Sequence, residues 1–355
     1  LFLLGSSGFF LNVITYSFGY LVDALFYIAN KSLLLDSEGG ITHWAGCVLP
    51  FLLCRVENVI ASCATHFCFC HRHVLNRRLN KRDYWEIMEW WLAVLLGILQ
   101  GVTEWLPVSS SGHLAIFQFY FEEEPPILFD IILHLGSLCV ILYIMRDEVR
   151  QVIIALPNFL KGLRSDNLKG DERIIAMVLV ASVPTAAIGF GFDSTVIGDF
   201  YSEMHLVGAC LIFTGILVWL SKDYDGKIDP DDFPIKNTFL IGIFQGLAIL
   251  PGISRSGSTI AISKILGMDP VKAARFSFLL FIPAIIGATL LKFEDIDETV
   301  SEVGALSLLL GFVASVITSY LAVNALLELI KQQKFHYFTP YCIVLGLILI
   351  FDSLN

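Results

Sequence analysis

Long apolar runs limit what this chain can fold into more than any other feature of its sequence. A helix needs about 20 predominantly apolar residues to cross the hydrocarbon core of a bilayer. Only 16% of the residues are charged, whereas soluble domains contain roughly a quarter. The fold class is therefore an all-α, multi-pass membrane protein. We predict spans at Ile127–Met145, Ile174–Phe192, Met204–Ser221, Val271–Leu291, Val303–Asn324 and Tyr337–Leu354.

An internal repeat divides this membrane region. "GILQGVTEWLPVSSSGHL" (Gly97–Leu114) aligns with "GIFQGLAILPGISRSGST" (Gly242–Thr259) at an offset of 145 residues. Each copy has two apolar pieces, too short to span, around a Pro/Gly/Ser break, which predicts a re-entrant hairpin. Three spans follow each hairpin, so the second half begins on the opposite side, as in an inverted-topology repeat. The two breaks should meet each other, because irregular backbone at that depth cannot face lipid.

The predicted membrane domain covers residues 88–355, with repeat halves at about 88–221 and 237–355. Residues 1–87 precede the first methionine, Met88. We expect this leader to be either an additional anchor or sequence from upstream of the gene's true start. It lacks the features of a cleaved secretory signal.

The remaining composition excludes other functional classes. The net charge is −10 and no basic stripe is present, so we expect no nucleic-acid partner. The leader segment "CATHFCFCHRH" (Cys63–His73) fits no standard zinc spacing. Cys139, Cys210 and Cys342 lie inside predicted spans, where a free thiol behaves as a small apolar group rather than as part of a disulfide framework.

Lysine and arginine in the loops predict the orientation, because cytoplasmic loops are enriched in them. The loop 146–173 contains six, whereas segments 122–126 and 193–203 contain none. On this pattern the first hairpin opens to the extracytoplasmic side, and the second hairpin enters from the cytoplasm.

The first break carries polar groups that are expensive inside a membrane and therefore indicate function. Gln100 and Glu104 share a helix face at i, i+4. Their oxygens are suited to a divalent cation, and Glu104 is also suited to acid–base chemistry. Ser109–Ser111 add hydroxyls, and His113 is a candidate nucleophile, base or acid. The alternatives are a Glu104 capped by serine hydroxyls or lying at the membrane surface, and a turn with a satisfied histidine.

The second break repeats the serines and adds an arginine. A Ser/Gly turn at a helix N-terminus can hold an anion, and Arg255 is suited to bidentate phosphate binding. The alternative for Arg255 is a structural pair with Glu104. Together the breaks form a phosphoryl-transfer site for a substrate with a lipid end. The predicted phosphate-binding residues are Arg255, Ser109, Ser111, Ser254, Ser256, Gly257 and Thr259.

A second i, i+4 pair, Asp130 and His134, begins the next span in "FDIILHLGSL". We expect these two side chains to support the site or to lie at the mouth of its pocket.

These motifs resemble the undecaprenyl-diphosphate phosphatase family, also called bacitracin-resistance proteins. "QGVTEWLPVSSSGHL", "HLGSL", "QGLAILPGISRSGST" and "RFSFLLFIPAIIGA" carry the resemblance, which covers Met88 to the C-terminus. It implies a multi-pass enzyme of the plasma membrane that hydrolyses a polyprenyl diphosphate to the monophosphate and phosphate. That reaction recycles the lipid carrier for cell-envelope synthesis and gives bacitracin resistance.

By this resemblance, Gln100 and Glu104 match the motif for a divalent cation, Mg²⁺ or Ca²⁺. Many relatives have Glu where this chain has Gln100, which keeps an oxygen donor but removes one negative charge from the motif. Ser110 and His113 match the catalytic residues, and Arg255 matches the phosphate-binding arginine. The nucleophile is either His113, or Ser110 with His113 as base.

Two other functions fit parts of the sequence. Inverted repeats with broken helices are typical of transporters, so a polyprenyl-phosphate flippase is the alternative function. Another lipid-phosphatase superfamily also uses Ser-Gly-His, but it requires an Arg-Pro dipeptide that this chain lacks. The expected partners are the polyprenyl diphosphate and the bilayer, and a homodimer is compatible with both functions.

Overall fold

The computed structural model describes residues 88–121, 125–161, 168–192, 200 and 203–354, so the predicted leader lies outside the described residues. Within them, the regular structure is helical apart from an isolated bridge between Ile228 and Met268. Five helical segments are long and apolar enough to cross a membrane, which confirms the predicted multi-pass fold class. They are α5 (Ile127–Ile144), α7 (Asp171–Gly191), α12 (Pro270–Lys292, continuing to Asp295), α14 (Ala305–Lys331) and η2 (Phe335–Phe338) with α15 (Thr339–Ser353).

The sixth predicted span is also a helix. It is α9 (Met204–Leu220), a shorter apolar helix of 17 residues. The longest disagreement between a predicted span and its helix concerns α14, which continues past the predicted end at Asn324 to Lys331. The Asn324 amide donates to the Tyr320 carbonyl of the same helix (2.7 Å), so this polar residue does not end the helix.

The segment 146–173, predicted as a loop, begins with a helix, α6 (Arg146–Lys161). Phe159 of α6 is buried against Ile175 of α7, whereas Ile153 and Ile154 are exposed. An amphipathic helix of this kind suits a membrane interface. The prediction missed it because its average hydropathy is low. Helix α13 (Ile296–Val303), preceded by η1 (Phe293–Asp295), connects the predicted spans Val271–Leu291 and Val303–Asn324.

The two predicted hairpins are present as pairs of short helices. The first contains α3 (Trp90–Trp105) and α4 (Ser110–Phe121), and the second contains α10 (Ile235–Leu247) and α11 (Arg255–Ile265). Helices of 11–16 residues are shorter than a bilayer core requires.

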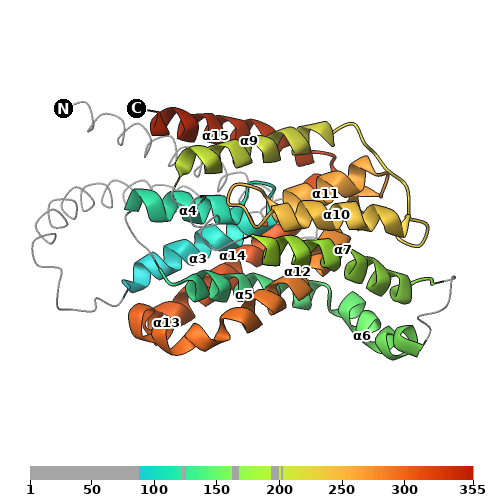
Figure 1. Cartoon of the computed structure of the whole chain (residues 1–355), viewed down its shortest axis with the longest axis horizontal. Helices are drawn as coiled ribbons and strands as arrows, with labels where there is room; N and C mark the ends of the chain where they lie inside the picture. The colour runs from blue at the N-terminus through green and yellow to red at the C-terminus, as the bar shows by residue number, and fades with distance from the viewer. Residues whose placement is uncertain (1–87, 122–124, 162–167, 193–199, 201–202, 355) are drawn as a thin grey trace, which may run out of the picture. The chain divides into compact units, whose positions relative to one another are not determined.

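Each hairpin packs against the opposite half of the chain. Helix α3 lies along α14 and α10 lies along α7, while α9 and α15 run side by side along one edge (Figure 1). Repeated glycines permit the two close approaches. A Cβ atom on Gly101 would lie 2.1 Å from Thr318 Oγ1, and one on Gly242 would lie 2.0 Å from the Ala181 carbonyl oxygen. Small residues at helix interfaces are typical of membrane helix packing.

The two breaks contact each other, as predicted. The Gly252 amide donates to Ser109 Oγ (3.1 Å), and the Ser256 hydroxyl donates to the Leu106 carbonyl (3.3 Å). Gly252 has φ +98° and packs against α9, where a Cβ atom would lie 2.4 Å from the Val207 carbonyl oxygen, so a side chain is excluded. The inverted topology of the two halves across the bilayer stays a prediction.

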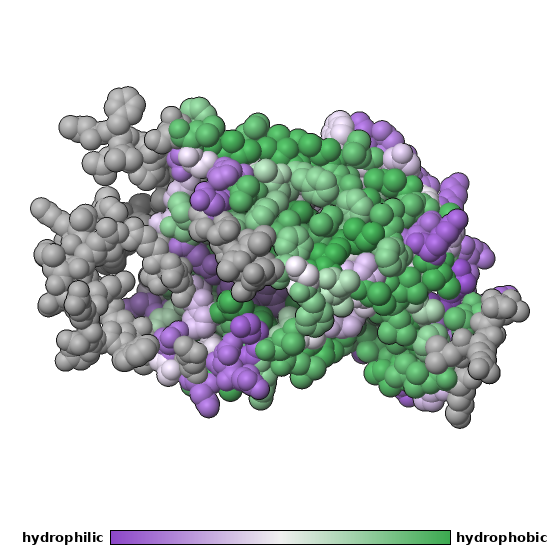
Figure 2. Space-filling model, viewed as in Figure 1, coloured by the Kyte–Doolittle hydropathy of each residue, from purple (hydrophilic) through white to green (hydrophobic). Residues whose placement is uncertain are grey.

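The surface is consistent with a lipid environment. Figure 2 shows hydrophobic side chains over most of the middle of the face in view, with hydrophilic side chains gathered toward its ends. Large apolar side chains such as Phe190, Leu290 and Leu309 are exposed on the spans. Soluble proteins rarely expose contiguous apolar area on this scale.

Candidate active site

A pocket of about 380 Å³ is lined by residues of both breaks. Helices α5, α7, α10 and α12 complete its walls. Its apolar side contains Ile131, Ile249 and Ile285. Its polar side consists of Glu104, Ser109, Ser110, Ser111, His134, Thr185, Gln245, Ser254 and Arg255. A pocket inside the membrane domain that combines these two sides fits an amphiphile with a charged head.

Glu104 is the centre of the polar network. Its Oε2 atom accepts hydrogen bonds from the Ser110 hydroxyl (2.6 Å) and the Gln100 amide (2.8 Å). His134 Nε2 lies 3.3 Å from the same atom, and Arg255 donates to Oε1 at 2.6 Å. The Glu104 side chain is only 5% exposed. A buried carboxylate with these partners is held in one orientation, because losing a partner would leave buried charge uncompensated.

Arg255 reaches Glu104 from α11, where it is the first helical residue. Its guanidinium also donates to the Ser277 carbonyl (3.4 Å) and lies 4.2 Å from the Phe281 ring centroid. The same guanidinium lies 5.3 Å from the ring of Trp105, which is fully buried between Phe278 and Phe281. These contacts fix the cation at the pocket wall. The side chain remains 13% exposed, so its other donors can meet a ligand.

Both breaks end at a serine that caps a helix. Ser254 Oγ accepts from the Gly257 amide (3.0 Å), and Ser109 Oγ accepts from the Gly112 amide (3.2 Å). Ser109 adopts φ +67°, a left-handed conformation uncommon for residues other than glycine. Capped helix N-termini that face one pocket favour an anionic ligand.

Sequence comparison identifies the family. The family model described as "Bacitracin resistance protein BacA" matches residues 93–348. A relative from Desulfosudis oleivorans, named undecaprenyl-diphosphatase, is 41% identical over 71% of this chain and 94% of its own length. The chain belongs to the BacA family.

Other relatives carry the same name. One from Methanobrevibacter smithii is 38% identical over 74% of this chain and 97% of its own length. Another from Bacteroides thetaiotaomicron is 36% identical over 75% of this chain and 100% of its own length. The BacA resemblance therefore covers the described membrane domain.

In this BacA domain, six predicted site residues line the pocket with His134. They are Glu104, Ser109, Ser110, Ser111, Ser254 and Arg255. The alternatives raised for Glu104 and Arg255 are also present, because Arg255 pairs with Glu104 and Ser110 caps it. The pair lies on the pocket wall, so its structural role does not exclude phosphate binding.

Other predicted residues lie behind the pocket. Thr259 donates to the Arg255 carbonyl (2.8 Å), and the Ser254 and Ser256 hydroxyls are 3.3 Å apart. Asp130 accepts from the Gln118 amide (3.1 Å), and its own carbonyl bonds to His134 Nδ1 (2.7 Å). These residues support the lining groups, as Gly257 does through its bond to Ser254.

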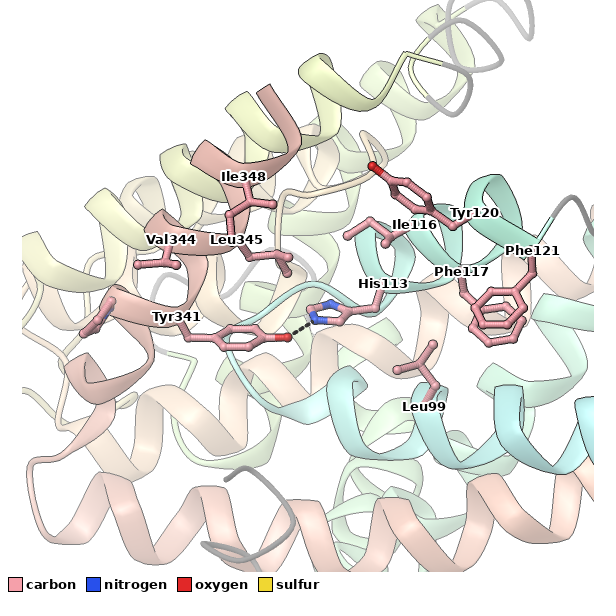
Figure 3. A pocket seen from close by; sticks show the side chains of 11 residues that line it. Leu99, His113, Ile116, Phe117, Tyr120, Phe121, Tyr341, Val344, Leu345 and Ile348 are labelled. Atoms are coloured by element: carbon pink, nitrogen blue, oxygen red, sulfur yellow. Dashed lines mark hydrogen bonds between the residues drawn. The ribbon is translucent and has the colours of Figure 1, made fainter. Parts of the chain in front are cut away.

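His113 lies on a different cavity from Glu104. Its Nδ1 atom is 2.7 Å from the Ser109 carbonyl oxygen, and its Nε2 atom is 2.6 Å from the Tyr341 hydroxyl. The ring lines an apolar cavity of about 340 Å³ between α4 and α15, as Figure 3 shows. The catalytic role of His113 stays a prediction, while His134 is the histidine that contacts Glu104.

A divalent cation at Gln100 and Glu104 stays a prediction. Both Glu104 oxygens accept hydrogen bonds, and the Gln100 amide nitrogen faces Glu104. Gln100 Oε1 is buried and has no hydrogen-bond partner among the described residues, so the pair keeps an oxygen donor that suits a cation. The described residues contain no group of three His, Cys, Asp or Glu side chains able to hold a metal, so a cation here would need further oxygen ligands from the substrate phosphates or water.

Three contributors to the site were missed from the sequence. Gln245 matches Gln100 in the repeat, so the alignment contained a signal for it. Phe281 lies in the motif "RFSFLLFIPAIIGA", and it packs under Arg255. Tyr341 lies in an apolar span far from both breaks in sequence, and no local pattern indicated its contact with His113.

Proposed function

We propose that this protein hydrolyses undecaprenyl diphosphate to undecaprenyl phosphate and inorganic phosphate. The observation that carries the proposal is the buried arrangement of the Ser110 hydroxyl on Glu104 beside Arg255, in a pocket with an apolar side. It supplies a nucleophile, a base and a phosphate-binding cation together. The names of the BacA relatives support a phosphatase and do not favour the flippase alternative.

Ser110 is the nucleophile that the geometry favours, because both ring nitrogens of His113 already have partners. The Ser110 oxygen bonds to the terminal phosphorus while the bond from that phosphorus to the bridging oxygen breaks. Undecaprenyl phosphate leaves with the bonding electrons. Glu104 takes the Ser110 proton and passes it to the departing undecaprenyl phosphate.

Water completes the reaction. Its oxygen bonds to phosphorus as the bond to Ser110 breaks, and phosphate is released. Glu104 takes a proton from the water and returns it to Ser110. Arg255 and the capped helix N-termini hold the phosphoryl oxygens through both steps.

Several finer statements belong to the same proposal. The loop charges support a first hairpin that opens to the extracytoplasmic side. Activity requires Mg²⁺ or Ca²⁺, the carrier lipid is recycled for cell-envelope synthesis, and raised expression increases tolerance to bacitracin. A homodimer stays a prediction.

The test is phosphate release from undecaprenyl diphosphate by purified protein in detergent, with each cation and with a chelator. A detergent micelle has no sides, so a flippase without hydrolytic activity would release no phosphate. Rapid quenching of a reaction with ³²P at the terminal phosphate, divided between acid, in which phosphoserine survives, and alkali, in which phosphohistidine survives, should trap acid-stable label on Ser110. Label on His113 would instead assign the attack to the imidazole.

A further inference from the structure

The ring of His113 is held in one tautomer by its two partners. The Ser109 carbonyl can only accept, so Nδ1 carries the proton and donates to it (2.7 Å). In the neutral ring, Nε2 is then an acceptor, and the Tyr341 hydroxyl donates to it (2.6 Å). Figure 3 shows this bond crossing from α15 to α4. A partner on one ring nitrogen sets the protonation of the other.

This tautomer matters because the hydrogen bond from His113 Nδ1 stabilises a strained turn at Ser109. Ser109 has φ +67°, which is unfavourable for a residue with a Cβ atom. Its carbonyl accepts from His113 Nδ1 and also from the His113 backbone amide (3.1 Å). The next residue is Ser110, whose hydroxyl lies 2.6 Å from Glu104. The histidine therefore stabilises the turn from which Ser110 points at its base.

The contacts of helix α15 with its neighbours hold Tyr341 in place. The next residue, Cys342, donates to the Pro107 carbonyl (3.3 Å), and Thr339 donates to the Gly215 carbonyl of α9 (3.1 Å). A Cβ atom on Gly346 would lie 2.4 Å from the Gly208 carbonyl oxygen, so α15 and α9 are in close contact. Helix α15 thus contacts the first break at both Pro107 and His113.

We propose that Tyr341 is a positioning residue for the reaction, acting through His113 and the Ser109 carbonyl on the direction of the Ser110 hydroxyl. The inference rests on the proposed function, since it assigns Ser110 to the attack. It gives His113 a role that depends on Nδ1. An attacking or proton-accepting histidine would instead need Nε2, which Tyr341 occupies.

The test compares Tyr341→Phe with the matched control Tyr337→Phe, whose ring is exposed on η2. Tyr341→Phe keeps the ring and removes one hydrogen bond, so kcat should fall about 10-fold. KM should stay within about 2-fold, because Arg255 and the helix N-termini still hold the diphosphate. The Tyr337→Phe control should match wild type.

Two histidine variants separate the ring nitrogens. The His113→Asn amide can replace Nδ1 toward Ser109, so it should keep within about 10-fold of the wild-type rate, and adding Tyr341→Phe should then have no further effect. The His113→Gln amide can replace Nε2 but not Nδ1, and should lose on the order of 100-fold.

Each opposite result overturns the inference. Unchanged kcat in a folded Tyr341→Phe protein would do so, as would His113→Gln retaining an equal or higher rate than His113→Asn. If Tyr341→Phe does not fold, the comparison of the two His113 variants decides alone. A wild-type protein that releases no phosphate would reject the proposed function, whereas active wild type with an unaffected Tyr341→Phe rejects only this inference.

Discussion

The first break and the second break share the same capping hydrogen bonds and present different side chains. In each, a serine caps a helix through the amide three residues ahead, and its hydroxyl lies 3.3 Å from that of the serine two positions on. Among the repeat positions that differ, Glu104, Ser110 and His113 in the first break correspond to Ile249, Arg255 and Ser258 in the second. The repeat therefore supplies two capped helix N-termini, and the differences between its copies supply the side chains to which we assign the chemistry.

The backbone itself differs in where the left-handed residue lies. The second break places its positive φ at Gly252, where no Cβ atom opposes it, and Ser254 is relaxed at φ −72°. The first break places its positive φ at Ser109 and adds His113 to hold that residue's carbonyl. The strained copy is thus the one that carries Ser110, the proposed nucleophile, as is common where geometry must be fixed for function.

The largest effect should come from removing the hydroxyl unique to the first break. Ser110→Ala should lower phosphate release by at least about 10³-fold, because the nucleophile is lost. The neighbouring Ser111→Ala keeps Ser110 and should lose less than about 10-fold. Steady-state phosphate release measures both. Comparable losses in the two variants would mean that the serines act only as a cradle.

The arginine unique to the second break should come next. Arg255→Lys keeps the charge but lacks the planar fork, so kcat/KM should fall about 100-fold. Arg255→Gln should also destabilise the protein by about 3 kcal/mol, because Glu104 would remain buried without its cation. Thermal unfolding in detergent tests the second statement. Wild-type stability of Arg255→Gln would show that the pair contributes little to folding.

Gly101 and Gly246 occupy equivalent positions in the repeat, but substitution by alanine should destabilise the protein more at Gly101 than at Gly246. A Cβ atom on Gly101 would meet Thr318 Oγ1 at 2.1 Å and the Ser315 carbonyl oxygen at 2.5 Å, whereas one on Gly246 would meet Ile188 Cδ1 at 2.8 Å and Cβ at 2.9 Å. Gly101→Ala should therefore destabilise the protein by about 3 kcal/mol, and Gly246→Ala, with its milder overlap, by about 1–2 kcal/mol. Equal shifts in the unfolding midpoint would contradict this packing difference.

The smallest difference in stability should be that between alanine variants of the two capping serines, Ser109 and Ser254. Ser254→Ala should lower the free energy of unfolding by about 1 kcal/mol, the usual effect of losing a cap. Ser109→Ala should lower it by about 2 kcal/mol, because Ser109 Oγ also accepts from Gly252 and so joins the breaks. The same unfolding assay applies. A larger effect at Ser254 would place the main link elsewhere.

The sequence predicted much of this arrangement for identifiable reasons. Apolar length located the spans, and the repeat indicated that the breaks meet. The charges of Arg255 and Glu104 predicted that the two residues share one site, and the 2.6 Å hydrogen bond between them confirms this. These signals are local or internal to the repeat, so one chain contains them.

What the sequence did not provide depends on packing between distant segments. Ser110 and His113 are three residues apart on α4, yet one faces Glu104 and the other faces Tyr341. Which cavity each enters is decided by where α5 and α15 pack. Helix α6 was missed because its alternation of charged and apolar residues does not resemble a span.

Each half of the repeat packs its re-entrant hairpin against a span of the other half, and this arrangement has a consequence for folding. Helix α3 near the start of the membrane domain finds its main neighbour in α14, and α10 finds its own in α7. Contacts between segments so distant in sequence form late, because the intervening chain must first be ordered. The pocket between the breaks cannot be assembled by the first half alone. We therefore expect the domain to gain its activity in one cooperative step rather than half by half.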